Sequence, residues 1–247
     1  MKIRTYLLVF ALAVLVPMIA FSAIAVVAFD RQQRAVVERT GIETARALVN
    51  AVDRELGATL TTLTTLATAR SLERGDLAMF EEDARRVLAR QHDWFTITLF
   101  SPEGRRVVDL STPPGTAPVG LVEPDSFQTL LRTARPAIGR VAAGPAGEYA
   151  FAVRVPVRRE GAVAFVLTGI LEPAAIGQIL TTQQIPVDWV GTIFDARRTI
   201  VARTRGTDEF LGRSISPEFA RLLDAAQEGW AITHTLEGVP VYTAFSR

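Results

Sequence analysis

LLVFALAVLVPMIAFSAIAVVAF, residues Leu7 to Phe29, is an apolar run that contains no charged residue and is interrupted only by Pro17 and Ser22. A helix of this length extends roughly 35 Å at about 1.5 Å per residue, and the hydrocarbon core of a bilayer is about 30 Å thick. A cleaved signal peptide would have a shorter apolar core, of about 7 to 15 residues, and a small-residue exit site, to which Ala23-Ile24-Ala25 is a weak match. The run therefore predicts one uncleaved transmembrane helix that holds the rest of the chain at a membrane.

Composition excludes several classes of protein. The chain has 247 residues, no cysteine, and a net charge of +1 from 27 basic and 26 acidic side chains. About 215 residues follow the apolar run, enough for one elongated domain or two small modules. A nearly neutral chain lacks the basic excess of a nucleic-acid-binding surface, so no nucleic acid is expected as a partner. Without cysteine, neither a disulfide framework nor a thiolate metal site is possible.

Flanking charge gives weak information on the orientation of the apolar run. Lys2 and Arg4 precede it, and Arg31, Arg34 and Arg39 follow it. Large domains cross a membrane largely regardless of such charges. We expect the N-terminus to lie inside the cell and the domain outside.

A long amphipathic helix is predicted from Asp30 to about Arg70. Its apolar residues recur at steps of three or four and form one stripe: Ala45, Val49, Val52, Leu56, Leu60, Leu63 and Ala67. This helix is either a signalling stalk or dimer seam, or it only packs against the sheet of its own domain, and both interpretations stay open. A second helix is expected from its N-cap, Asp76, to about Gln91.

Strands follow these helices, because the apolar pattern changes to alternation. Trp94 to Phe100 alternates, Ser101-Pro102-Glu103-Gly104 has the composition of a turn, and Arg105 to Leu110 is the expected return strand. A Pro- and Gly-rich loop and a short helix come next, followed by further strands and another helix. The expected ranges are 111–124 for the loop, 126–133 for the helix, 137–142, 148–157 and 162–171 for strands, and a helix from residue 173.

The remaining sequence repeats this order, with expected strands at 189–194, 199–203, 229–236 and 239–245 and a helix capped by Ser216. TLF at Thr98 matches TIF at Thr192, SFQTLL at Ser126 matches EFARLL at Glu218, and YAFAVR at Tyr149 matches YTAFSR at Tyr242. The offset between the matched segments stays between about 92 and 94 residues, which indicates a duplicated unit. Two similar antiparallel-sheet modules in tandem are therefore predicted after the long helix.

This order of elements resembles the double Cache sensor domains, also called PDC-like folds, of bacterial membrane receptors. PVRREGAVAFVLTGILEP at Pro156, GTIFDARRTIVAR at Gly191 and GVPVYTAFSR at Gly238 are similar to the sensor regions of membrane histidine kinases. The resemblance covers about Asp30 to Arg247 and implies an α+β fold with an N-terminal transmembrane helix, a long stalk helix and two tandem PAS-like antiparallel-sheet modules. The implied divisions are a cytoplasmic N-terminus (1–5), a transmembrane helix (6–29), the long and second helices (30–92), a membrane-distal module (93–182) and a membrane-proximal module (183–247).

The sequence differs from this family in two respects. Family members usually continue through another strand, a second membrane helix and a cytoplasmic output module, whereas this sequence ends at Arg247 within a strand pattern. The membrane-proximal module is therefore expected to be truncated. The amino-acid-binding members carry Tyr, Arg and Trp-Tyr positions in the distal module, but residues 111–135 contain no Tyr or Trp. Recognition of a free amino acid through that pattern is not expected.

One predicted strand supplies the candidate ligand site. Alternation in the strand 149–157 places Ala150, Ala152 and Arg154 on the face opposite to Tyr149. A face of small residues leaves space, and a guanidinium on that face could hold a carboxylate through paired hydrogen bonds. The resemblance implies that the pocket lies on the sheet face away from the long helix.

The candidate ligand-binding residues are Arg154, Asp109, Thr96, Thr98 and Tyr149. The two threonines would line the same face from the neighbouring strand, and Asp109 would offer an acceptor. In the alternative interpretation Arg154 reaches water and the threonines are ordinary exposed strand residues. Asp195 lies in a predicted turn, where capping of the local backbone is favoured over contact with a ligand.

No enzyme activity, cofactor or metal is predicted from the sequence. The only histidines, His92 and His234, lack metal-binding spacing, and Ser111 is the obvious nucleophile that an enzyme interpretation would need. The resemblance implies the small-molecule-sensing input part of a membrane receptor, a sensor histidine kinase. It further implies a homodimer with a single pass through the inner membrane and its domain in the periplasm. The alternative is a membrane-anchored extracytoplasmic ligand-binding or scaffold protein without an output of its own.

Overall fold

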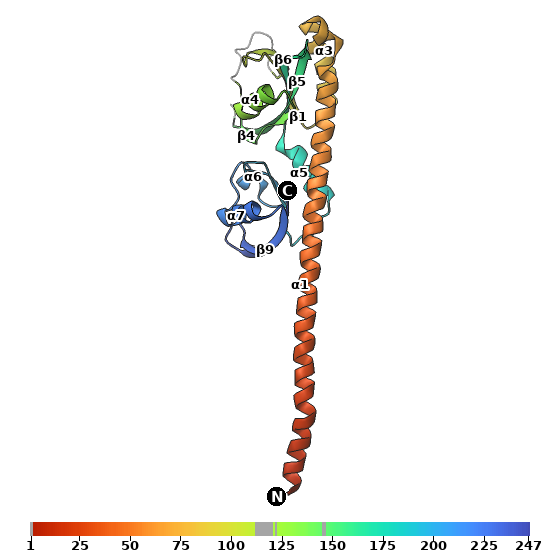
Figure 1. Ribbon diagram of the computed structural model, residues 1–247, viewed down its shortest axis with the longest axis vertical. Helices are drawn as coiled ribbons and strands as arrows, with labels where there is room; N and C mark the ends of the chain where they lie inside the picture. Colours follow the sequence, from red (N-terminus) through yellow and green to blue (C-terminus); the bar gives the residue numbers. More distant parts are fainter. Residues whose placement is uncertain (1, 112–120, 122, 145–146) are drawn as a thin grey trace.

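One very long helix organises the molecule. The computed structural model describes the backbone of residues 2–111, 121, 123–144 and 147–247, and within the first 31 residues only some of the side chains. Helix α1 covers Lys2–Ala67, which is 66 residues and therefore about 100 Å long. All other elements lie beside its C-terminal half, whereas the N-terminus stands alone at the far end (Figure 1).

The apolar run 7–29 belongs to the N-terminal part of α1. Many of its side chains lie outside what the structure describes. The prediction of a transmembrane helix at 6–29 therefore falls largely on residues whose side chains are not described. Of the helices that the described residues form, none is long and apolar enough to span a membrane.

The first half of the domain is a sheet with helices on both faces. After α1 come α2 (Arg70–Arg74) and α3 (Leu77–Leu88), and Asp76 caps α3 by accepting a hydrogen bond from the backbone nitrogen of Met79. The strands are β1 (Trp94–Phe100), β2 (Arg106–Asp109), β3 (Ala137–Ile138), β4 (Ala142–Ala143), β5 (Tyr149–Arg159) and β6 (Ala162–Leu171). They pair antiparallel in the order β2-β1-β6-β5-β3, and β4 also pairs with β5.

The core of this half lies between the sheet and the helices. Strands β1, β5 and β6 direct a row of aliphatic side chains toward the predicted apolar stripe of α1, and the core includes Leu63, Ile97, Leu99, Val153, Val155 and Leu167. Gly169 allows close contact here, because a Cβ atom at that position would lie 3.3 Å from Leu63 and Trp94. The stripe of α1 therefore packs against the sheet of its own chain.

Helix α4 (Pro124–Thr133) covers the opposite face of this sheet. Phe100 of β1 and Phe127 of α4 meet edge to face, with ring centroids 5.9 Å apart, and Leu130 and Val166 complete this smaller apolar cluster. Figure 1 shows α4 on the side of the sheet away from α1.

The second half repeats the arrangement with shorter elements. Helix α5 (Pro173–Thr182) leads to β7 (Thr192–Phe194), β8 (Ile200–Arg203), α6 (Thr207–Phe210), α7 (Pro217–Ala225), β9 (Glu228–His234) and β10 (Pro240–Ser246). Strand β7 pairs with β8 and β9 pairs with β10, both antiparallel, as two separate pairs. Ser216 caps α7, as expected, by accepting a hydrogen bond from the backbone nitrogen of Phe219.

Two expected strands have other boundaries in the structure, and two short helices were not predicted. The strand expected at 137–142 is two short strands, β3 and β4, because only residues 137–138 and 142–143 pair with β5. The strand expected at 189–194 begins at Thr192, since Trp189 bonds back to Pro186 in a turn. The short helices α2 and α6 were not predicted, because they have too few residues to show a helical period.

The two halves agree in detail. In the first half the pairing of β1 with β2 shifts register between Leu99 and Phe100, and the pairing of β7 with β8 shifts between Ile193 and Phe194. Helices α4 and α7 both begin with proline. The edge-to-face pair of Phe100 and Phe127 has a counterpart in Phe194 and Phe219, whose ring centroids are 5.8 Å apart.

Candidate functional site

Four polar side chains form a row across the first sheet. Thr98 of β1 lies opposite Asp109 of β2 on one side and opposite Thr168 of β6 on the other, and Thr168 in turn lies opposite Arg154 of β5. Directly paired residues of antiparallel strands project from the same face of the sheet. Asp109, Thr98, Thr168 and Arg154, called the polar row below, therefore cross four neighbouring strands on the face that α4 covers.

Three residues of the polar row are buried, and Asp109 at its end is half-buried. Thr98, Thr168 and Arg154 expose 3%, 0% and 1% of their surface, respectively. The interpretation in which Arg154 reaches water and the threonines are exposed is therefore wrong. Sequence alternation could not separate the two cases, because burial of this face depends on α4, which is distant along the chain.

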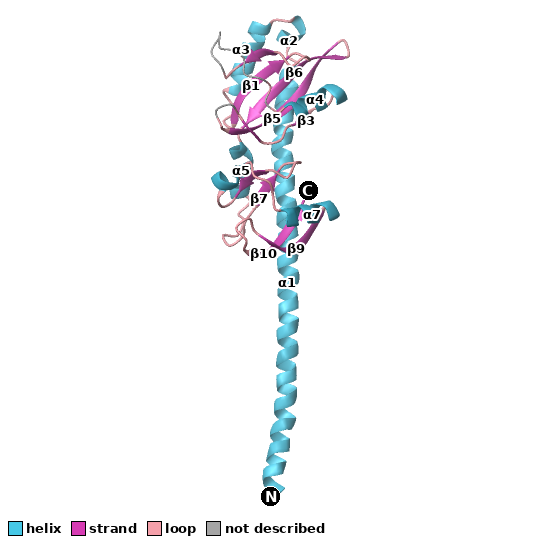
Figure 2. Cartoon of the chain, turned by 90° about the vertical axis from the view of Figure 1, so that its left-hand side faces the viewer, coloured by secondary structure: helices cyan, strands magenta, loops and turns pink. Residues whose placement is uncertain are grey.

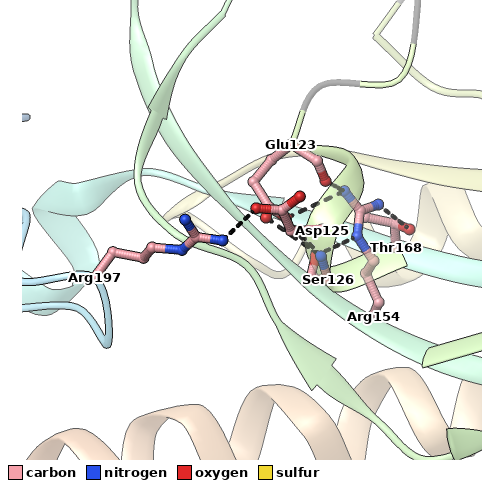
Figure 3. Close-up of polar contacts among 6 residues, drawn as sticks. All are labelled: Glu123, Asp125, Ser126, Arg154, Thr168 and Arg197. Atoms are coloured by element: carbon pink, nitrogen blue, oxygen red, sulfur yellow. Dashed lines mark hydrogen bonds and ion pairs between the residues drawn. The ribbon is translucent and has the colours of Figure 1, made fainter. Parts of the chain in front are cut away.

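Arg154 joins the sheet to the beginning of α4 (Figure 3). Its Nε donates to Ser126 Oγ at 2.8 Å, Nη1 donates to Thr168 Oγ1 at 3.1 Å, and Nη2 donates to the backbone oxygen of Glu123 at 3.0 Å. The carboxylate of Glu123 lies 3.9 Å from Nη2. Burial lowers the pKa of Arg154 to about 10, although the charge of Glu123 opposes this shift. Arg154 is therefore a buried cation at neutral pH.

Glu123 has an unusual backbone conformation at this point. Its φ of 57° lies in the left-handed region, which non-glycine residues rarely adopt. Its carboxylate caps α4 by accepting from the backbone nitrogen of Ser126, at 3.3 Å, and it also accepts from Ser126 Oγ. Such strained residues persist where the surroundings fix them, and they cluster at functional sites.

The other end of the polar row has a second charged pair. Arg106 forms an ion pair with Asp109, and Ser111 donates to Asp109 from both its backbone nitrogen, at 3.0 Å, and its Oγ, at 2.7 Å. Burial raises the pKa of Asp109, but the bonds from Ser111 and the charge of Arg106 outweigh burial and leave the pKa below its usual value. Asp109 is therefore ionised near neutral pH.

Thr98, in the middle of the row, has an unpaired polar atom. Within the part of the chain that the structure describes, Thr98 Oγ1 and Arg106 Nε are buried and have no hydrogen-bond partner. A buried hydroxyl without a partner costs about 1–3 kcal/mol. The unpaired hydroxyl of Thr98 thus lies between Asp109 and Thr168, with a guanidinium group beyond each of them: Arg106 paired with Asp109, and Arg154 bonded to Thr168.

The structure places the remaining candidates differently. Thr96 lies two residues from Thr98 on the same face and is buried, and its Oγ1 donates to the backbone oxygen of Ile97 at 3.4 Å. Tyr149 lies on the opposite face with the core residues that face α1, and its ring packs against Gly212 of the second half. The structure therefore groups Arg154, Asp109, Thr98 and Thr96 but not Tyr149.

Sequence reasoning missed four residues of this site: Thr168, Ser126, Glu123 and Arg106. A signal existed for Thr168, since it is the only hydroxyl residue in the otherwise apolar stretch 162–171. Ser126 and Glu123 act through the start of α4, and no local pattern indicates that this helix faces Arg154.

Polar contacts also join the two halves of the domain. Asp195 caps its own turn, as expected, by accepting from the backbone nitrogens of Arg197 and Thr199 at 2.8 and 2.9 Å. Its other oxygen accepts from the backbone nitrogen of Val141 at 3.1 Å. Arg197 donates to Asp125, at the start of α4, at 2.6 Å (Figure 3). The second half therefore contacts the same helix end that Arg154 holds.

Comparison with known proteins identifies the fold. No family model and no curated protein matches the chain. Among solved structures, the extracellular domain of rpHK1S-Z16, assigned as a histidine kinase, superposes with a TM-score of 0.69 at 14% identity over 87% of this chain and 90% of that one. The ligand-binding domain of the Pseudomonas fluorescens chemoreceptor CtaA in complex with L-isoleucine gives 0.62 at 11% identity, over 88% and 95%.

A third solved structure agrees with these two. The periplasmic sensory domain of the Campylobacter jejuni chemoreceptor Tlp1 has a TM-score of 0.59 at 11% identity, over 86% of this chain and 90% of that one. The chain thus has the mixed α+β fold of the extracytoplasmic sensor domains of histidine kinases and chemoreceptors. This confirms the fold that the sequence resemblance predicted.

Proposed function

We propose that this chain is the extracytoplasmic small-molecule-sensing part of a membrane-anchored receptor, the input part of a sensor histidine kinase. In this proposal residues 6–29 anchor the chain in the inner membrane, and the domain lies in the periplasm. Residues 93–182 are the membrane-distal module and residues 183–247 the membrane-proximal one. The sensor fold and the position of the apolar run at the far end of α1 support this assignment. The proposal assigns no catalytic step to the chain.

The observation that carries the proposal is the unpaired hydroxyl of Thr98 within the buried polar row. A protein that only needed a stable sheet would gain from an apolar residue at this position, because the buried hydroxyl has no partner to offset its loss of hydration. A ligand that bonds to Thr98 Oγ1 would supply that partner. We therefore place the ligand on the α4 face of the distal sheet.

The guanidinium groups at the two ends of the polar row favour a ligand that carries a carboxylate, while the ionised Asp109 opposite Thr98 opposes one at that strand. Arg154 lies on one side of the row, and Arg106, with its unpaired buried Nε, lies on the other. Guanidinium groups bind carboxylates through directed, charge-assisted hydrogen bonds. The complex of CtaA contains L-isoleucine, which has such a group. Arg154 already holds Ser126 and Glu123, so it acts mainly by fixing α4 over the row, while Thr98 and Arg106 offer the open bonds.

Signalling would use the helix that both halves share. Strands β5 and β6 of the distal half and β9 and β10 of the proximal half all contact α1. A ligand that binds one arrangement of sheet and helix better than another shifts the equilibrium between them by its difference in affinity. We propose that α1 transmits this shift toward the membrane within a homodimer.

A calorimetric titration tests the proposal on the full chain in detergent. The probes are small carboxylates and L-amino acids, each titrated into the wild type and into Thr98→Val and Thr61→Val variants. Thr61 serves as the matched control, because it is an exposed residue of α1 whose hydroxyl bonds only to its own helix. We expect saturable binding of at least one probe and a loss of about tenfold in affinity in Thr98→Val only. Equal affinity in all three proteins would refute the assignment.

A further inference from the structure

The turn between β7 and β8 is the part of the second half that contacts helix α4. In this turn the backbone nitrogen of Arg198 donates to the backbone oxygen of Asp195 at 2.8 Å. Oδ1 of Asp195 accepts from the backbone nitrogens of Arg197 and Thr199, and these bonds fix the shape of the turn. The second carboxylate oxygen of Asp195 is therefore available to a different part of the chain.

Two hydrogen bonds join this turn to the first half, and together they are called the turn contact below. Asp195 Oδ2 accepts from the backbone nitrogen of Val141 at 3.1 Å, and Arg197 Nη2 donates to Asp125 Oδ2 at 2.6 Å (Figure 3). Val141 lies just before β4, outside the described ladders that β3 and β4 form with β5. Asp195 thus supplies an acceptor where the strand pairing of the first half is interrupted.

Asp125 lies in the same turn of α4 that Arg154 holds from the sheet. Arg154 Nε donates to Ser126 Oγ at 2.8 Å, and Nη2 donates to the backbone oxygen of Glu123 at 3.0 Å. The next residue, Phe127, begins the apolar contacts that hold the middle of the helix. Polar bonds from two parts of the chain therefore fix the beginning of α4, and one of them comes from the second half.

A molecule that bonds to Thr98 must displace part of the cover over the polar row. Thr98 exposes only 3% of its surface, and the direct bond from Arg154 to Ser126 leaves no space for a molecule between this side chain and the beginning of α4. Protein interiors are close-packed, so a ligand of several atoms can enter only when the beginning of α4 shifts outward to cover it. The bond from Arg197 to Asp125 opposes that shift.

We propose that the turn contact regulates the ligand site: it holds the beginning of α4 over the polar row, and ligand binding loosens it. Arg197 is then a positioning residue, which acts on the site through Asp125. The proposal rests on the ligand site proposed above and adds its regulation by the second half. Coupling between two sites is reciprocal, so a ligand that loosens the turn contact must bind more tightly when this contact is absent.

Calorimetric titration of the full chain in detergent tests the coupling, with the small carboxylates and L-amino acids used above as probes. The variants are Arg197→Ala, Asp125→Ala and the double variant. Arg221→Ala is the matched control, because Arg221 is an exposed residue of α7 that bonds within its own helix, to the backbone oxygen of Pro217.

The ion pair is exposed, so each single variant should bind about two- to fivefold more tightly than the wild type. The double variant should show no further gain, since both substitutions remove the same interaction. A general disturbance of the fold would weaken binding instead. Equal affinity in all proteins, or weaker binding in Arg197→Ala, would overturn the proposal and leave the proposed ligand site in place.

Hydrogen exchange without a probe tests the turn contact separately. Absence of binding to the wild type would contradict the proposed function, and exchange then decides the contact by itself. Arg197→Ala should speed exchange at 126–130 by about two- to fivefold. Asp195→Asn, which keeps one acceptor oxygen for its own turn, should speed exchange at Val141. Unchanged exchange in both variants would overturn the proposal.

Discussion

At the scale of single residues, the two threonines at the centre of the polar row have opposite roles. Thr168 Oγ1 accepts a hydrogen bond from buried Arg154, whereas Thr98 Oγ1, directly opposite in the sheet, has no partner among the described residues. A hydrogen bond to a charged group contributes about 1.5–3 kcal/mol, whereas an unpaired buried hydroxyl is a cost. The structure therefore separates a threonine that stabilises a buried cation from one whose buried hydroxyl has no partner among the described residues.

This difference predicts opposite effects of the same isosteric change. Thr168→Val should lower the free energy of unfolding by about 1.5–3 kcal/mol, because it leaves a buried guanidinium nitrogen without its acceptor. Thr98→Val should leave the free energy unchanged or raise it by up to about 1 kcal/mol. Urea unfolding of both variants gives the two values. An equal loss in both would contradict the assignment of the unpaired atom.

The ion pair between Arg203 and Glu237 predicts sensitivity to acid. The side chain of Arg203 is almost buried, and its two terminal nitrogens donate to Glu237 at 2.7 and 2.9 Å. These bonds lower the pKa of Glu237 from its usual value near 4.5 to about 2. The contribution of this ion pair to the free energy of unfolding is therefore complete above a pH of about 4.5. It is lost as the pH falls toward about 2 and Glu237 becomes protonated.

The thermal midpoint of the wild type, followed from pH 6 down to pH of about 2.5, should fall more steeply than that of Glu237→Gln. The difference between the two proteins should be largest at pH 6 and shrink as Glu237 becomes protonated. Parallel curves over this whole range would show that the ion pair does not contribute to stability.

The sequence could predict much of the site at this scale. Alternation placed Arg154 and Thr98 on one face correctly, because the period of a strand is fixed by its backbone. It also placed Tyr149 on the opposite face correctly, but it could not show that this ring meets Gly212, and it could not find Glu123 or Ser126. These three depend on how separate elements pack, which no local pattern encodes.

At the scale of elements, α1 holds the two halves of the domain together, and one glycine permits its contact with β10. A Cβ atom at Gly41 would lie 2.8 Å from the Cβ of Ala244, a distance that requires one of the two elements to shift. At Gly57, in the same helix, a Cβ atom would meet nothing within 4 Å. The sequence showed both glycines only as weak points in the helix, because the partner of Gly41 lies about 200 residues away.

Alanine substitutions at these glycines should therefore have opposite effects. Gly57→Ala should raise the free energy of unfolding by about 0.5–1 kcal/mol through helix propensity alone. Gly41→Ala should not give this gain in stability, because its Cβ atom would push β10 away from α1. Faster hydrogen exchange at 240–246 would report that separation. The same increase in stability in both variants would show that α1 and β10 are not in close contact.

At the scale of the whole molecule, the two halves are joined by specific contacts as well as by α1. Asp195 bonds to Val141, Arg197 bonds to Asp125, and the ring of Tyr149 packs against Gly212 (Figure 2 shows the two halves stacked along α1). The second half thus contacts α4, the helix that covers the polar row.

The contact of Tyr149 with Gly212 can be tested by substitution. Gly212 has φ of 78°, and a Cβ atom there would overlap the ring of Tyr149, whereas Gly238 has φ of 83° and open space around it. Gly238→Ala should therefore cost only the backbone strain of about 1–2 kcal/mol. Gly212→Ala should cost more, since it also displaces the ring. Equal costs, measured by urea unfolding, would mean that the contact does not join the halves.

The sequence predicts the overall architecture better than its details. The constant offset between matched segments indicated a repeat, and the structure shows the same register shift and ring pair in both halves. The sequence could not show that the strands of the second half form two separate pairs, because this depends on the order of strands in space and not along the chain.

The most direct test of the proposed function is to locate the bound molecule. Hydrogen exchange of the full chain is measured with and without the probe that gives the largest heat in the titration. The proposed site predicts slower exchange in β1, in β6 and at the beginning of α4, around Thr98, Thr168 and Ser126. Protection confined to β7 and β10, or no protection by a probe that binds, would contradict a ligand site on the α4 face of the distal sheet.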